Sequence, residues 1–161
     1  MTIEFLQLLL LIIIANGAPI IVRALINDSF KLAVDFGQKL PDNNPVFGPS
    51  KTWRGIFSAL AVTSFTAWLI GLSIETGFMI ASYAVTGDLI SSFIKRRIGM
   101  PSSSMAPLLD QVPESLLPAY MMKDTFGLGI FSVFLMVLIF IITELILSHI
   151  FYKAGIRKRP Y

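Results

Sequence analysis

Long apolar stretches that are almost free of charge recur along this chain. They cover residues 3–22, 56–74, 76–87 and 125–143, and the only charge inside them is that of Glu4. A helix that crosses a membrane needs about 20 mostly apolar residues. A soluble domain of 161 residues has no use for so much apolar surface, with 55% of its residues hydrophobic and 14% charged. The sequence therefore predicts an integral membrane protein.

We predict one all-α transmembrane domain over residues 1–161, with about five membrane-spanning helices. The fourth helix is interrupted by Asp110, Glu114 and prolines, so we expect it to be short, bent and buried in protein. The first segment lacks the basic start and cleavage site of a signal peptide, so we expect it to be retained as a span. The predicted spans are residues 3–25, 55–73, 76–95, 106–122 and 126–152.

The distribution of basic residues predicts the orientation. With five spans, the loops at 27–54 and 96–107 lie on the same side of the membrane as the C-terminus. Of the 13 lysines and arginines, only Lys123 then lies on the other side. Because basic residues concentrate on the cytoplasmic side, we predict cytoplasmic loops, an external N-terminus and a location in the cell membrane.

The first cytoplasmic loop is long for so small a chain. Apolar residues recur at near-helical spacing from 27 to 40, which predicts an amphipathic helix on the membrane surface. Lys51, Thr52 and Arg54 follow at the junction with the second span, where free backbone N–H groups favour a phosphate. The alternative is a basic membrane anchor with Trp53 in the interfacial aromatic belt.

Asp88 lies in an otherwise uncharged predicted helix, where a carboxylate costs about 2.5–3.5 kcal/mol at the bilayer centre. Ser91, Ser92 and Lys95 follow three, four and seven positions later, so they share one helix face with Asp88. An ionisable residue inside a membrane span, such as Asp88, is by default expected to be functional. The alternative is a purely structural ion pair between Asp88 and Lys95.

A second carboxylate, Asp110, follows where the chain returns to the membrane. We expect Asp88 and Asp110 to converge at the cytoplasmic ends of neighbouring helices and to bind Mg²⁺, which takes carboxylate and phosphate oxygens. Basic residues beside them, including Lys95–Arg97, are typical of phosphoryl or nucleotidyl transfer. The alternatives are another enzyme acting on a lipid phosphate, or a small transporter that moves protons or cations through the two carboxylates.

Other residue types exclude some functions. The sequence has no cysteine, so it has no disulfide framework and no thiolate metal site. We expect the single histidine, His149, to pack inside the helix bundle, and we expect no nucleic-acid partner. The oligomeric state and the roles of Asp35, Asp42 and Glu144 stay open.

Several motifs together resemble those of the phosphatidate cytidylyltransferase superfamily, whose members form CDP-alcohols. Residues 87–97 (GDLISSFIKRR) and 108–111 (LLDQ) carry the likeness. The likeness to its archaeal branch, the CDP-archaeol synthases, covers almost the whole chain through residues 16–19 (NGAP), 35–37 (DFG), 51–55 (KTWRG) and 158–160 (KRP). The Lys-Asp pair and His-Gly-Gly of the bacterial and eukaryotic pattern are missing between Arg97 and Asp110, which favours the archaeal branch.

The resemblance implies that CTP and an unsaturated prenylated ether-lipid phosphate, digeranylgeranylglyceryl phosphate, react to CDP-archaeol and pyrophosphate with Mg²⁺. It implies that Asp88 and Asp110 hold the metal, and that Lys95, Arg96 and Lys51 neutralise charge on the leaving pyrophosphate. The remaining residues assigned to nucleotide or phosphate contacts are Thr52, Arg54, Asn16, Ser92 and Arg97. For Asn16, a hydrogen bond between helices is the alternative.

Overall fold

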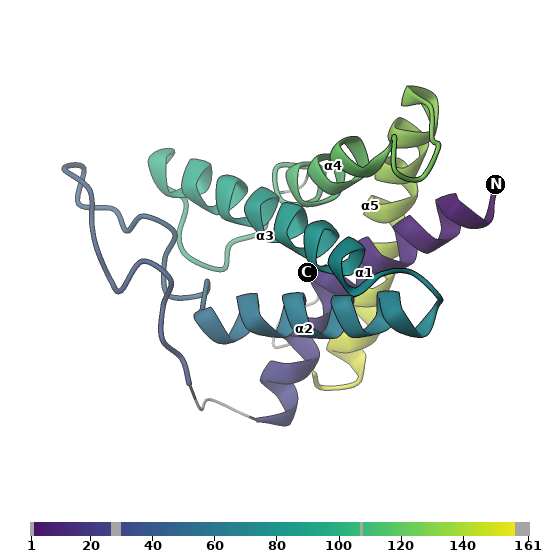
Figure 1. Cartoon of the computed structure of the whole chain (residues 1–161). Helices are drawn as coiled ribbons and strands as arrows, with labels where there is room; N and C mark the ends of the chain where they lie inside the picture. Colours follow the sequence, from purple (N-terminus) through teal and green to yellow (C-terminus); the bar gives the residue numbers. More distant parts are fainter. Residues whose placement is uncertain (1, 27–29, 107, 157–161) are drawn as a thin grey trace.

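Five α-helices make up the ordered framework of this protein (Figure 1). The computed structural model describes residues 2–26, 30–106 and 108–156, and these ranges contain no β-strand, only isolated bridges between Ala33 and Thr52 and between Lys39 and Pro45. The all-α prediction is confirmed. The helices are α1 (Ile3–Leu25), α2 (Trp53–Leu69), α3 (Ile74–Arg97), α4 (Gln111–Met122) and α5 (Ile130–Lys153).

Three of the five helices in the described ranges, α1, α3 and α5, are long and apolar enough to cross a membrane. The other two are shorter, with 17 residues in α2 and 12 in α4. At 1.5 Å per residue α4 is about 18 Å long, well short of a hydrocarbon core of about 30 Å. The prediction of five complete spans is therefore not confirmed, although all five helices are present.

The start of α4 corrects the boundary predicted at residue 106. The Asp110 carboxylate accepts a hydrogen bond from the Ala106 backbone N–H at 3.0 Å, and the Gln111 side-chain oxygen accepts one from Leu108 at 2.8 Å. Leu108 has a φ of 66°, which a helix does not allow. These side chains satisfy the backbone of a turn instead, so α4 begins at Gln111.

The long loop does not contain the predicted amphipathic helix in its described part. Residues 30–40 form turns and bridge positions. Phe36 and Gly37 have φ values of 49° and 76°, and the Asp35 carboxylate accepts hydrogen bonds from the backbone of Gly37, Phe47 and Gly48 at 2.8–3.1 Å. The Asp35 side chain holds the backbone in a compact loop, and this backbone conformation is not helical. Residues 27–29 lie outside the described part of the chain.

The hydrophobic core gathers around α1, which packs against all four other helices. Its apolar residues meet α5, α4 and α3 in one cluster that includes Leu8, Leu11, Ile12, Ile80, Ala119, Met122, Val133, Met136 and Phe140. Beside it, Ala15 packs against Ala81 and Ala84 of α3. Small residues let helix backbones approach closely, so α3 lies tightly against α1.

Two glycines of α3 mark its closest approaches to its neighbours. A Cβ atom on Gly77 would lie 2.6 Å from the Ser64 Cα of α2, and one on Gly87 would lie 2.8 Å from the Glu114 Cα of α4. Neither distance is compatible with a side chain. Glycine at these positions therefore sets the separation of α3 from α2 on one side and from α4 on the other.

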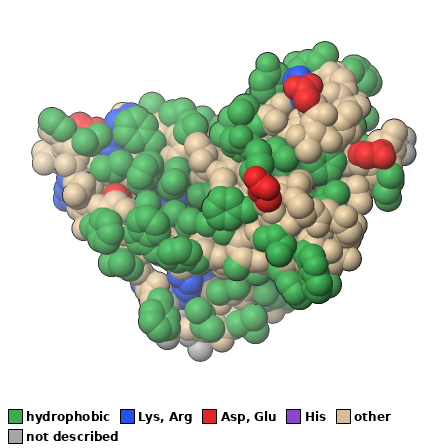
Figure 2. Space-filling view, in the orientation of Figure 1, with side chains coloured by type: hydrophobic (Ala, Val, Ile, Leu, Met, Phe, Trp, Pro, Cys, Tyr) green, Lys and Arg blue, Asp and Glu red, His purple; other side chains and the backbone are tan. Residues whose placement is uncertain are grey.

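Apolar side chains spread over much of the visible surface, with few charged groups between them (Figure 2). The exposed large apolar residues include several from each long helix, among them Leu6, Phe78, Phe131, Phe134 and Leu138. Such a surface is suited to lipid rather than water, in agreement with the prediction of a membrane protein.

Candidate active site

An ion pair joins the end of the long loop to the middle of α3. The Lys51 ammonium donates hydrogen bonds to both carboxylate oxygens of Asp88, each at 2.6 Å. Burial alone would lower the pKa of Lys51, but Asp88, with Glu114 and Asp110 further off, raises it above its ordinary value. Lys51 therefore stays a cation in its ion pair with Asp88.

A second ion pair joins the end of α3 to the start of α4. The Lys95 ammonium lies 2.5 Å from the Asp110 carboxylate and also donates to the Ser104 carbonyl at 3.2 Å. Asp88 thus pairs with Lys51 rather than with Lys95, contrary to the structural pair considered from helical spacing. The four residues of the two ion pairs thus come from three segments: the long loop, α3 and the turn before α4.

Arg96 and Arg97 connect α3 to both loops. Arg96 is buried and donates to the Ser102 hydroxyl at 3.0 Å. Arg97 donates to the Asp42 carboxylate at 2.9 Å and to the carbonyl oxygens of Asn44 and Pro45. A Cβ on Gly48 would lie 2.5 Å from the Ser102 hydroxyl oxygen, so the two loops also touch directly.

Asp35 organises the first loop around this junction. Burial would raise the pKa of its carboxyl, but the backbone N–H groups of Gly48, Phe47 and Gly37 lower it below its ordinary value. Hydrogen bonds to a carboxylate favour its charged form. The sequence left the role of Asp35 open, and these hydrogen bonds indicate a structural role. Asp42 also helps to hold the loop, through its ion pair with Arg97.

The remaining predicted site residues occupy several places. Thr52 caps α2, since its hydroxyl accepts from the Gly55 N–H at 3.2 Å, and Ser92 is buried on α3. The Asn16 side chain donates to the Ile12 carbonyl of its own helix at 2.9 Å, not to another helix. Arg54 lines a separate, mostly apolar cavity.

Glu114 is the residue of this region that the sequence analysis did not assign to the site. It is 8% exposed, and its Cα lies against Gly87, the neighbour of Asp88. The signal was present, because a carboxylate within an apolar segment is costly and functional by default. The prolines around Glu114 were instead interpreted as a sign of a bent helix.

The carboxylates fit a metal that is shared with a substrate. In the described ranges, no three acidic or histidine side chains lie close enough together to hold a metal ion. Asp88 and Asp110 each offer hard oxygen atoms, as Mg²⁺ requires, and this ion is often bound by one or two carboxylates together with substrate phosphates. The donor set therefore suits Mg²⁺ bound jointly with a triphosphate.

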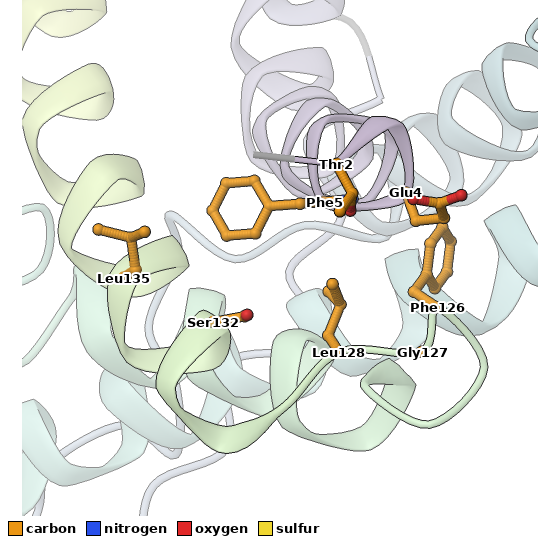
Figure 3. A pocket seen from close by; sticks show the side chains of 8 residues that line it. All are labelled: Thr2, Glu4, Phe5, Phe126, Gly127, Leu128, Ser132 and Leu135. Carbon is orange, nitrogen blue, oxygen red and sulfur yellow. The ribbon is translucent and has the colours of Figure 1, made fainter.

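A cavity of about 570 Å³ lies elsewhere, between the start of α1, the turn after α4 and the start of α5 (Figure 3). Its lining includes Phe5, Phe126 and Leu135, and among its described lining residues only Glu4 has an ionisable side chain. None of the predicted site residues lines it. It is therefore separate from the ion pairs of α3.

Comparison with known proteins identifies relatives of this chain. Residues 69–161 match a family model that is described as CarS-like, the model of the CDP-archaeol synthases. The chain is 31% identical to a CDP-archaeol synthase of Pyrobaculum islandicum over 92% of each chain. It is 34% identical to a CDP-archaeol synthase of Pyrococcus horikoshii, but that match spans only 60% of the relative's length and 60% of this chain.

A solved structure has the same arrangement of helices. It is described as an intramembrane enzyme for archaeal membrane lipids biosynthesis, and it matches with a TM-score of 0.73 and 27% identity. The match covers 88% of this chain and 90% of that one. The likeness therefore extends over nearly all of the fold.

Proposed function

Because this chain belongs to the CDP-archaeol synthase family, we propose that it transfers the cytidylyl group of CTP to a prenylated ether-lipid phosphate. An oxygen of the lipid phosphate would attack the α-phosphorus of CTP, and the bond to the β-phosphate would break. The products are a CDP-lipid and pyrophosphate. The observation that carries the proposal is the pair of lysine–carboxylate contacts, Lys51–Asp88 and Lys95–Asp110.

Electrostatic repulsion is the main obstacle to this reaction, because both substrates are anions. Lys51 and Lys95 would neutralise the triphosphate and the leaving pyrophosphate, and the buried Arg96 would add a third positive charge. Preorganised charges of this kind contribute most where water is excluded. No protein nucleophile is required, since the lipid phosphate itself attacks.

Asp88 and Asp110 would hold Mg²⁺ together with the CTP phosphates. When bound, the ion would neutralise phosphate charge and align the two substrates. In its absence Lys51 and Lys95 neutralise Asp88 and Asp110, so that each of these two carboxylates has a counter-charge. On substrate binding, each lysine can then turn from its carboxylate to a phosphate oxygen while the charge balance is kept.

We assign the ion-pair region to the cytoplasmic side, where CTP is present. The basic residues of both loops support this orientation through the positive-inside rule. The basic residues at 157–159 lie outside the described part of the chain. Thr52, Asn16, Ser92 and Arg97 act in this scheme mainly as supports, since the contacts of Thr52, Asn16 and Arg97 are with the protein's own backbone or loop.

The test is release of pyrophosphate by the purified protein in detergent, given CTP, Mg²⁺ and a geranylgeranyl ether-lipid phosphate. We expect release that requires both lipid and metal. Asp88→Asn keeps the size of the side chain but removes its charge, and should lower kcat at least 100-fold, the loss of roughly 2.7 kcal/mol of transition-state stabilisation. Activity unchanged in Asp88→Asn would contradict the assigned site.

The transporter alternative lacks support, because the relatives are named as synthases. If the folded protein were inert with every nucleotide and lipid phosphate offered, the cytidylyltransferase proposal would fail. A second measurement separates the causes. Binding of CTP with Mg²⁺, followed by the quenching of the two tryptophans, distinguishes a missing lipid substrate from a site that does not bind nucleotide.

A further inference from the structure

A second cavity, of about 610 Å³, lies where the start of α2 meets the end of α1 and the long loop. Its walls are Val22 of α1, Phe30 and Leu32 of the loop, and Trp53, Phe57 and Ala61 of α2. Phe30 and Phe57 are 81% and 63% exposed. The cavity is therefore a groove open along its side, which we call the α2 groove.

Among the described residues that line this groove, Arg54 is the only charged one and Ser58 the only other polar one, and the rest are apolar or aromatic. Arginine is the side chain best suited to bind phosphate, because its planar guanidinium offers several donors. A ligand that complements the groove thus has a long apolar part and one anionic group. A nucleoside triphosphate does not fit this description, since apolar walls leave its polar groups unpaired.

Backbone pairing places the wall of the α2 groove near Lys51, which pairs with Asp88. The Val34 N–H donates to the Lys51 carbonyl at 2.9 Å, and the Trp53 N–H donates to the Leu32 carbonyl at 3.0 Å. Leu32 and Trp53 in the groove wall therefore belong to the same paired segments as Lys51. Arg54 follows Lys51 by three residues, so their Cα atoms lie at most about 11 Å apart.

We propose that the α2 groove binds a prenyl chain of the lipid phosphate, with Arg54 contacting the phosphate beside Lys51. This inference rests on the proposed function and deepens it. It assigns Arg54 to the lipid rather than to the nucleotide. The prenyl chain moves from the apolar bilayer into an apolar groove, so burial of apolar surface contributes little to binding. The groove therefore selects the lipid mainly by the shape of its prenyl chain.

Filling the groove tests the proposal. Ala61 is exposed in the groove wall, so Ala61→Trp narrows the groove without opening a cavity. The matched control is Ala24→Trp, at an exposed alanine of α1 that does not line the groove. Pyrophosphate release is measured with CTP and a lipid phosphate bearing either geranylgeranyl or short six-carbon chains.

We expect Ala61→Trp to raise the KM of the long-chain lipid about tenfold, a discrimination typical of a change in shape of an apolar pocket. The KM of CTP and that of the short-chain lipid should stay within twofold. Equal kinetics for Ala61→Trp and Ala24→Trp would overturn the proposal, since the groove would then hold only bulk lipid. A raised KM for CTP would overturn it too, in favour of a nucleotide site.

Two further variants keep the test decisive if Ala61→Trp fails to fold. Phe57→Ala widens the groove, and Phe134→Ala removes an equally exposed ring from α5; only the former should alter the KM ratio of long to short chains. Arg54→Gln should raise the KM of both lipids but not of CTP, whereas Arg23→Gln, on exposed Arg23 of α1, should not. An inactive wild type would refute the proposed function rather than the groove.

Discussion

Replacing Gly87 with alanine tests how strictly the separation of α3 and α4 controls the site. The new Cβ would lie 2.5 Å from the Pro113 carbonyl carbon and 2.8 Å from the Glu114 Cα, where ordinary contact begins at 3.4 Å. These neighbours are backbone atoms, so they cannot rotate away as a flexible side chain could. The first turn of α4 must therefore move by roughly 1 Å, as overpacked cores do at a cost of about 1–3 kcal/mol.

Asp110 immediately precedes this turn, so it moves away from Lys95 and Asp88 together with α4. A misplacement of about 1 Å can lower a rate about 100-fold, and we expect a fall in kcat of that order. Pyrophosphate release measures it, and thermal unfolding in detergent shows whether the variant is folded.

Gly17→Ala is the control for Gly87→Ala. A Cβ on Gly17 of α1 meets nothing within 4 Å, so alanine there should stabilise the helix by about 0.5–1 kcal/mol and leave kcat unchanged. If folded Gly87→Ala kept the wild-type kcat, the claim that α4 must lie this close to α3 for catalysis would be refuted.

Three further predictions concern the loop and its connections to α3. Asp35→Asn should lower the free energy of unfolding by about 1.5–3 kcal/mol, because hydrogen bonds to a charged group are lost; denaturant titration measures this. The pKa of Asp35 is lowered by folding, so its stabilising effect is complete above the ordinary pKa of 3.8 and is lost as the pH falls through the lowered value. Below pH 3.8 the wild type should therefore lose stability more steeply than Asp35→Asn, and parallel curves would contradict this assignment. Arg97→Gln should speed proteolysis of the 30–52 loop more than Asp42→Asn does, because Arg97 also donates to two backbone carbonyls; equal cleavage rates would count against that reasoning. Lys95→Met should lower kcat more than it raises either KM, since Lys95 would act on charge developing in the transition state, and steady-state kinetics separates the two effects.

Hydropathy predicted the helices well wherever apolar length alone decides. The first helix was predicted at 3–25 and is found at Ile3–Leu25, and the third extends by only two residues at each end of the predicted 76–95. The end of the second span and the start of the fifth were each predicted four residues outside α2 and α5. The other two errors, the start of α4 and the predicted loop helix, lie where a side chain competes with the helix for backbone hydrogen bonds. Asp110 and Asp35 both accept such bonds, and such local competition leaves little trace in the spacing of apolar residues.

The residues that form the two ion pairs of the candidate site could be predicted more fully than their pairing. Asp88, Lys95 and Asp110 stood out because charges are rare in apolar segments, and the structure places each of them in one of the two ion pairs. Helical spacing suggests Asp88 with Lys95, yet the partner of Asp88 is Lys51, 37 positions earlier. Such long-range pairing depends on how helices pack, which no local pattern contains.

Several side chains in the C-terminal half of α3 connect this helix to the two loops. Lys51 reaches Asp88 across 37 positions, and Asp42 reaches Arg97 across 55. Contacts between residues so distant in sequence form late in folding, because closing a long loop costs conformational entropy before the contact can stabilise it. During synthesis, the first loop emerges before α3, so its ion pairs with Asp88 and Arg97 cannot yet form. If these ion pairs form the proposed active site, that site is completed at one late step of membrane assembly, when α3 takes its place beside the first loop.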